Sequence, residues 1–172
     1  IDLLFLDPAR RDSGGRKVVL LEDCEPNVVA LLPQLLKAAR CVVLKLSTML
    51  DINQALKELQ KVTEVHVFAE HGECKDLLFV LQRDVEEEHE PTLFCVDGEQ
   101  VFSFTQGFEA NAEVVYAAPD CQSLSEAYLY EPSAAILKAG AFKSVAAKFN
   151  VQKLHPNSHL YVSGNRIEDF PG

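Results

Sequence analysis

The stretch "FLDPARR", residues 5–11, closes an apolar run that starts at residue 1. The run, "IDLLFLD", is almost continuously hydrophobic, which favours a strand buried in a parallel sheet over a half-exposed strand. Asp7 then stands at the carboxyl end of that strand, the edge where open α/β sheets bind ligands. Pro8 fixes φ and has no N–H, so the turn that follows should be stiff. These residues predict an α/β fold with a candidate site beside Asp7.

Strand and helix patterns alternate after this stretch. A helix is expected over residues 28–40, followed by a second buried strand, "CVVLKLS", at 41–47. Asp51 can accept hydrogen bonds from the first-turn amides of the next helix, and Gln54 can reach back to complete a capping box. Strands are expected at 64–70 and 76–83, and only five residues separate them, too few for a helical crossover. They should therefore pair antiparallel, giving the order β-α-β-α-β-β.

The second half of the chain has a different pattern of predicted strands and helices. A hairpin is expected over 92–104 around Asp97-Gly98, because that dipeptide readily supplies positive φ at a tight turn. Further strands are expected at 112–118 and 159–164, and one continuous helix over 131–150. The prediction is two domains, residues 1–83 and 84–172, joined by an acidic linker at about 84–91.

The 172-residue chain carries a formal net charge of −10, and 48% of its residues are hydrophobic. This length suits one or two domains, and the apolar fraction suffices for a packed core. The acidic balance disfavours a broad basic surface for phosphate backbones, so nucleic acid needs a local basic patch, and DNA binding is not expected. No apolar run approaches the roughly 20 residues of a membrane span. We expect a cytoplasmic protein without a membrane partner.

The cysteines are odd in number and widely spaced, which indicates reduced thiols rather than a disulfide framework. They are Cys24, Cys41, Cys74, Cys95 and Cys121. His71 and Cys74 form one H-x-x-C pair, but a structural zinc needs four ligands, so no metal is expected. His155 and His159 flank Pro156, which disfavours a helix there, and both are interpreted as loop residues.

Arg10 and Arg11 follow the turn at Pro8 and can hold a phosphate or carboxylate, which planar guanidinium groups bind in bidentate fashion. The competing interpretation is that an Asp-Pro pair simply starts a turn and that loop arginines are solvated. Short motifs of this kind carry a high rate of false positives, so residues alone leave both interpretations open.

A resemblance to a known family adds to the interpretation of these residues. "DLLFLDPARR" (2–11) and "VVLKLSTMLD" (42–51) resemble the ends of the fourth and fifth strands of a class I S-adenosylmethionine-dependent methyltransferase. Together with "YLYEPSAAILKAGAFKSVAAKFNVQKLHPNSHLYVSG" (128–164) and "DFPG" (169–172), they resemble a bacterial family, common in Bacteroidetes, whose C-terminal part is called THUMP-like. The resemblance covers essentially the whole chain. It implies the C-terminal half of a Rossmann-like sheet followed by a small α+β, THUMP-like unit.

The resemblance also implies roles for particular residues. The motif that faces the methyl group and target atom matches the candidate catalytic residues Asp7, Pro8, Ala9 and Arg10. Asp7 is at the same time the candidate cofactor contact. The candidate substrate-binding residues are Arg11, Lys45 and Ser47. Lys45 has the alternative of pairing with Asp7 or with a buried carboxylate. Related amino-methylating enzymes carry Asp-Pro-Pro-Tyr, whereas Ala9 and Arg10 stand here, which argues against base stacking at that position.

The Gly-rich loop and the acidic residue that hold S-adenosylmethionine in such enzymes are not in this sequence. The expectation is therefore a C-terminal portion of a longer enzyme, inactive alone, whose truncated sheet edge can cause self-association. RNA is the expected substrate class, by analogy with other THUMP modules. Lys138, Lys143, Lys148 and Lys153 form a basic stripe that can serve RNA binding or simply be a solvated helix face.

Two alternatives remain open. A non-catalytic methyltransferase-like scaffold can bind RNA or protein through its second half. A hydrolase with Asp7 as nucleophile lacks a second acid in the usual pattern.

Overall fold

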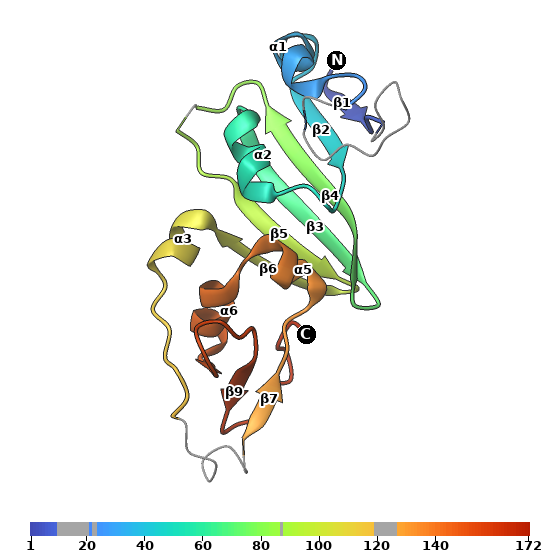
Figure 1. Ribbon diagram of the computed structural model, residues 1–172. Helices are drawn as coiled ribbons and strands as arrows, with labels where there is room; N and C mark the ends of the chain where they lie inside the picture. Colours follow the sequence, from blue (N-terminus) through green and yellow to red (C-terminus); the bar gives the residue numbers. More distant parts are fainter. Residues whose placement is uncertain (10–20, 22–23, 87, 119–126) are drawn as a thin grey trace.

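The structure is a computed structural model that describes residues 1–9, 21, 24–86, 88–118 and 127–172. The strands are β1 (Leu3–Leu6), β2 (Cys41–Leu46), β3 (Val62–Glu70), β4 (Glu73–Gln82), β5 (Thr92–Asp97), β6 (Gln100–Thr105), β7 (Tyr128–Tyr130), β8 (Gln152–Lys153) and β9 (Tyr161–Ser163). The helices are α1 (Val28–Ala38), α2 (Ile52–Glu58), α3 (Gln106–Asn111), α5 (Ala134–Ala139) and α6 (Phe142–Phe149). Figure 1 shows their arrangement.

The main sheet has six strands in the order β1-β2-β4-β3-β5-β6, and a second sheet has the order β7-β9-β8. β1 is parallel to β2, and β3 is parallel to β5. The pairs β2–β4, β3–β4 and β5–β6 are antiparallel. The predicted order β-α-β-α-β-β and the antiparallel β3–β4 pair are confirmed, as is the α/β character of the chain.

The hairpin around Asp97-Gly98 is also confirmed, and Gly98 has the positive φ that its turn requires, 58°. Its place in the fold was not foreseen. β5 lies parallel to β3, so the hairpin extends the main sheet instead of starting a separate one. Strands on both sides of residues 84–91 therefore belong to one sheet. The division of the chain into two domains at these residues stays a prediction.

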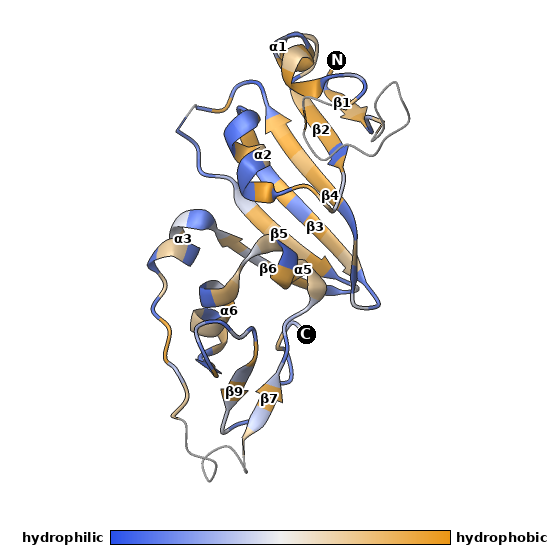
Figure 2. Cartoon of the chain, viewed as in Figure 1, coloured by the Kyte–Doolittle hydropathy of each residue, from blue (hydrophilic) through white to orange (hydrophobic). Residues whose placement is uncertain are grey.

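The two faces of the main sheet differ. One face packs under α1, α2 and α5, and its strand residues are buried, such as Leu44 on β2 and Phe79 on β4. Figures 1 and 2 show α2 and α5 over the same side of largely hydrophobic strands. The alternate residues form the second face, which we call the open face. They are half-buried or exposed, and Leu3 and Phe5 of β1 are 57% and 54% exposed. The prediction that this first strand is buried rather than half-exposed is therefore wrong for the described residues.

Local capping residues set the starts of the first two helices. Asn27 accepts from the Ala30 N–H, and Asp51 accepts from the Gln54 N–H at 2.9 Å. The predicted capping box is only half formed, because the Gln54 side chain donates to Glu58, one turn later, instead of reaching back. Pro33 lies inside α1.

The single helix predicted over 131–150 is wrong. Gly140 adopts φ of 76° and ends α5, and α6 begins two residues later. The hydrophobic spacing runs through the break, so periodicity alone could not reveal it. The strand predicted at 112–118 is also wrong, since this segment makes only an isolated bridge between Tyr116 and Lys153. The strand predicted at 159–164 is confirmed as β9.

α6 lacks a side-chain cap of its own, because Ala141 occupies the N-cap position. Glu109 of α3 takes that role from a distant part of the chain. Its two carboxylate oxygens accept from the N–H groups of Lys143 and Ser144 at 2.8 and 2.7 Å. A carboxylate there also complements the positive end of the helix. One side chain thus joins α3 to the C-terminal part of the fold.

Glu109→Ala should lower the free energy of unfolding by about 1 kcal/mol, because two first-turn amides lose their acceptor. Urea denaturation monitored by circular dichroism measures this. Glu113→Ala removes an exposed glutamate nearby and serves as the matched control. Equal stability of both variants would contradict the assigned capping role.

Lys153 is a buried lysine, with 5% of its surface exposed. Its ammonium group donates to the Pro156 carbonyl at 3.3 Å and lies near the rings of Phe142 and Tyr161. Burial lowers the pKa of Lys153 below its ordinary 10.5, and the nearby Glu109 carboxylate partly opposes this shift. The folded state therefore loses this proton at lower pH than the unfolded state does.

A group whose pKa is lower in the folded state adds stability as pH rises from that pKa towards the unfolded value of 10.5. Lys153→Met removes this gain. The free energy of unfolding of the variant minus that of wild type should therefore decrease as pH rises towards 10.5. Urea titrations across this range test the slope. Lys57→Met, which removes an exposed lysine of α2, should leave a flat difference.

Candidate functional site

The strand β1 delivers Asp7 to the carboxyl edge of the main sheet. Asp7 is exposed, whereas Pro8 is buried. Ala9 exchanges two backbone hydrogen bonds with Glu25, at 2.8 and 3.2 Å. The turn is thus held by β1 before Asp7 and by the Ala9–Glu25 hydrogen bonds after it. The Ala9 carbonyl accepts from the Glu25 N–H. Arg10 and Arg11 lie outside the described residues.

Lys45, near the end of β2, forms an ion pair with Asp76 of β4 at 2.8 Å. The sequence suggested Asp7 or a buried carboxylate as its partner. The partner carboxylate is instead half-exposed and comes from the neighbouring antiparallel strand. Lys45 and Asp76 both lie on the open face, because Lys45 is opposite Leu78 and Asp76 is two residues away on β4.

Ser47 begins the loop beyond β2. Its hydroxyl accepts from the Met49 N–H at 3.2 Å, and its carbonyl accepts from the Leu50 N–H. Lys138 of α5 donates to the Leu50 carbonyl at 2.7 Å, so the C-terminal part of the chain holds this loop. Ser47 therefore shapes the loop that borders the carboxyl edge.

The structure brings Asp7 and Lys45 to the same edge. Phe5 is opposite Val43 in the parallel β1–β2 pair; Lys45 lies two residues further along β2, and Asp7 directly follows the last residue of β1. Parallel strands present such residues side by side on one face. Asp76 belongs to this group but was missed from the sequence. Only the antiparallel β2–β4 pairing places Asp76 near Lys45, and the sequence did not define the register of that pairing.

A second polar pair lies on the open face, towards the middle of the sheet. The His66 imidazole and the Glu64 carboxylate of β3 are 2.7 Å apart. The imidazole ring stacks on Phe94 of β5, with ring centroids 4.7 Å apart. The open face thus carries polar pairs as well as apolar side chains.

The described cysteines, Cys24, Cys41, Cys74 and Cys95, form no disulfide. Burial raises the pKa of the Cys95 thiol to about 12 and also raises the pKa of Cys74, whose thiol donates to the Ala134 carbonyl. Raised pKa values disfavour the reactive thiolate form. Cys121 lies outside the described residues.

Within the described part of the chain, no three potential ligands among His, Cys, Asp and Glu gather to hold a metal ion. His71 of the H-x-x-C pair is instead near Glu70, at 3.8 Å. His155 and His159 lie in the loop before β9, where His159 stacks on Phe142. No helix among the described residues is both long and apolar enough to cross a bilayer.

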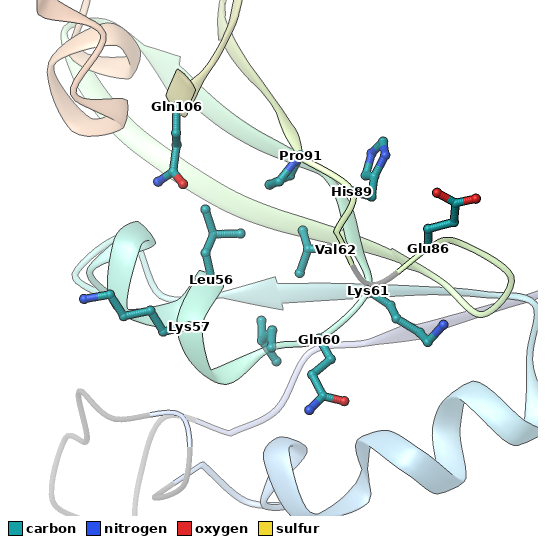
Figure 3. Close-up of a pocket in the computed structure, with 10 residues that line it drawn as sticks. Leu56, Lys57, Gln60, Lys61, Val62, Glu86, His89, Pro91 and Gln106 are labelled. Atoms are coloured by element: carbon teal, nitrogen blue, oxygen red, sulfur yellow. The ribbon is translucent and has the colours of Figure 1, made fainter. Parts of the chain in front are cut away.

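A hollow of roughly 340 Å³ lies at the opposite, amino edge of the sheet, where β3 and β5 begin (Figure 3). Its walls include Leu56 and Val62, but its charged groups do not converge. Figure 3 shows the Lys57 side chain extending away from the hollow. The Lys61 ammonium donates to two backbone carbonyls, and the Gln106 amide donates to Asn53. This hollow is therefore separate from the group around Asp7.

Comparisons with known proteins bear on this geometry. Residues 128–171 match the family model of a ferredoxin-like domain. The chain is 36% identical to a crystal structure described as a putative methyltransferase from Porphyromonas gingivalis W83, with a TM-score of 0.87. The match covers 99% of this chain and 42% of that one, so the chain spans less than half the length of that protein. No curated protein matches the chain.

The structural similarity agrees with the coarse resemblance carried by "DLLFLDPARR" and "VVLKLSTMLD". The ferredoxin-like description applies to the β7-β9-β8 region with α5 and α6, where the sequence suggested a THUMP-like unit. At 36% identity over nearly its whole length, the chain is thus similar in sequence and structure to part of a methyltransferase-like protein.

Proposed function

We propose that this chain is part of an S-adenosylmethionine-dependent methyltransferase and forms the target-facing side of its active site. The observation that carries this proposal is the 36% identity to a structure described as a putative methyltransferase, across 99% of the chain. The exposed Asp7 carboxylate at the carboxyl edge of a partly parallel sheet supports it, because ligands of open α/β sheets bind at that edge.

The incomplete surroundings of β1 support a role within a longer polypeptide. In the described residues β1 pairs only with β2, which leaves its other edge open. Leu3 and Phe5 on this strand and Ile1 before it are exposed, although soluble proteins seldom present contiguous apolar surface. Further polypeptide packed on β1 and the open face explains both features. Without it, self-association through this edge is expected.

The residues around Asp7 fit one side of the proposed cofactor site. S-adenosylmethionine, when bound, supplies an electrophilic methyl group. The protein must then orient the target atom and accept its proton. Asp7 is placed to accept a hydrogen bond from that atom and to take the proton. The anchored turn at Pro8 and Ala9 fixes the direction of the carboxylate.

RNA remains the proposed substrate class, with Arg10 and Arg11 as the groups that hold its phosphates. The four lysines of the predicted basic stripe do not support RNA binding. Lys138, Lys143 and Lys148 each donate to a backbone carbonyl of another segment, and Lys153 is buried. These ammonium groups are engaged with other parts of the fold, although Lys143 and Lys148 are exposed residues.

A non-catalytic scaffold is the second candidate. The observation that favours it is that Lys45 and Ser47 already have partners within the protein, whereas Asp7 is exposed. Intact binding of cofactor together with no methyl transfer to any nucleic acid or protein would support it.

Calorimetric titration of S-adenosylhomocysteine into this chain and into a longer polypeptide that contains it tests the proposal. We expect binding by the longer polypeptide only, since one side of the cofactor site is present here. Absence of binding by both, with both shown to be folded, would exclude the enzyme.

Asp7→Asn in the longer polypeptide should lower the rate of methyl transfer to bulk cellular RNA by about 100-fold or more, as expected for loss of a general base. Binding of S-adenosylhomocysteine should be retained. Asp2→Asn, at the amino end of the same strand segment, is the matched control and should leave the rate unchanged.

A further inference from the structure

We propose that a groove between α1 and α2, at the amino edge of the main sheet, binds a small amphipathic anion: a carboxylate with a hydrocarbon chain of medium length. The volume of the groove is about 480 Å³, within the range of small-molecule sites, about 300–1,000 Å³. The groove lies at the edge opposite Asp7. The inference therefore goes beyond the proposed methyltransferase function and does not rest on it.

One wall of the groove is apolar and comes from a single face of α1. Val29, Leu32, Pro33 and Leu36 line it, and spacings of three and four residues place them side by side along the helix. Leu32 and Leu36 are 5% and 8% exposed, whereas Val29 is half-buried. A hydrocarbon chain against this wall is removed from water, which is favourable in proportion to the apolar area buried.

Pro33 is the exposed member of this wall. A proline inside a helix cannot donate to the carbonyl four residues earlier, here that of Val29, and it destabilises the helix. An exposed proline gains little core packing in return. The helix thus keeps a costly, rigid and apolar ring at the groove, and contact with a ligand explains why.

The opposite wall is formed by Glu58, Gln60 and Lys61, where α2 leads into β3. Gln60 and Lys61 also line the hollow of Figure 3, so they separate the groove from that hollow. Lys61 has φ of 61°, a left-handed conformation that is strained in a lysine and is often found at binding sites. Its ammonium donates to the carbonyls of Arg83 and Val85, at 3.0 and 2.8 Å, which holds this wall in place.

The groove is basic, although the whole chain has a net charge of −10. Lys37, Lys61 and Arg83 line it, and Glu58 is the acidic residue of its walls. The Glu58 carboxylate accepts from the Gln54 amide at 2.6 Å, so it is directed along α2. Cations thus outnumber carboxylates in this one groove of an acidic protein. This charge favours an anionic ligand.

Lys37 is the cation that is available to a ligand. It is exposed, and no acid pairs with it in the part of the chain that the structure describes. Arg83 is less available, because its Nε lies 3.2 Å from Asp84, whose carboxylate is also 4.0 Å from Arg40. A carboxylate beside Lys37 gains a charge-assisted hydrogen bond while its hydrocarbon chain covers the apolar wall. Both parts of the ligand are therefore matched.

Calorimetric titration of octanoate into this chain and into the longer polypeptide tests the proposal. Octanoate should bind at least about 10-fold more tightly than octanol, because only the carboxylate forms a charge-assisted hydrogen bond. The longer polypeptide should bind octanoate equally well. No octanoate binding, equal binding of octanol, or loss of binding in the longer polypeptide would overturn the proposal, since the last result would make the groove an internal packing surface.

Two variants locate the site. Lys37→Gln should lower the affinity for octanoate by at least about 10-fold and leave the affinity for octanol unchanged. Val29→Phe narrows the groove and should weaken the binding of both ligands. Lys57→Gln, which changes an exposed lysine of α2 outside the groove, is the matched control and should alter neither affinity. Circular dichroism checks the fold of each variant.

Lys37 also lies in the last turn of α1, where a cation stabilises the helix end. A purely structural role predicts that Lys37→Gln lowers the urea midpoint and leaves octanoate affinity unchanged. That result, or an equal loss of octanoate affinity in Lys57→Gln, would overturn the assignment of the groove as an anion site.

Discussion

The antiparallel pairing of β2 with β4 is the constraint on which the rest of this structure depends. Leu44 lies opposite Phe79 and Leu46 opposite Leu77, all four fully or almost fully buried under the helices. A shift of one residue would turn these side chains to the open face, so burial fixes the register. The same register places Lys45 and Asp76 together on the opposite face. Core packing and site geometry therefore have one cause.

The C-terminal part of the chain completes this arrangement rather than standing apart from it. β5 pairs with β3, and α5 packs on the buried face of the same sheet. Lys138 of α5 holds the loop beyond β2 through the Leu50 carbonyl, and Glu109 caps α6. The ferredoxin-like region thus supports the carboxyl edge where Asp7 is found.

The proposed function at that edge rests on the exposed carboxylate of Asp7. Asp7 is exposed on a turn held by backbone hydrogen bonds, and Lys45 forms an ion pair with Asp76. The open face, and the edge of β1 that no described strand pairs with, present apolar surface that an isolated soluble domain seldom retains. The proposed methyltransferase, of which this chain would form one part, would account for these features and is consistent with the similarity to the Porphyromonas gingivalis structure.

The sequence by itself determined the order of the first six elements, the β3–β4 and β5–β6 hairpins, and the position of Asp7, because these follow from local hydrophobic period, turn residues and short connections. It could not determine that Gly140 splits a helix, since the periodicity continues across it. Only the tertiary structure decided that β5 joins β3 and that Asp76 pairs with Lys45. Both depend on contacts between distant segments, which no local pattern encodes.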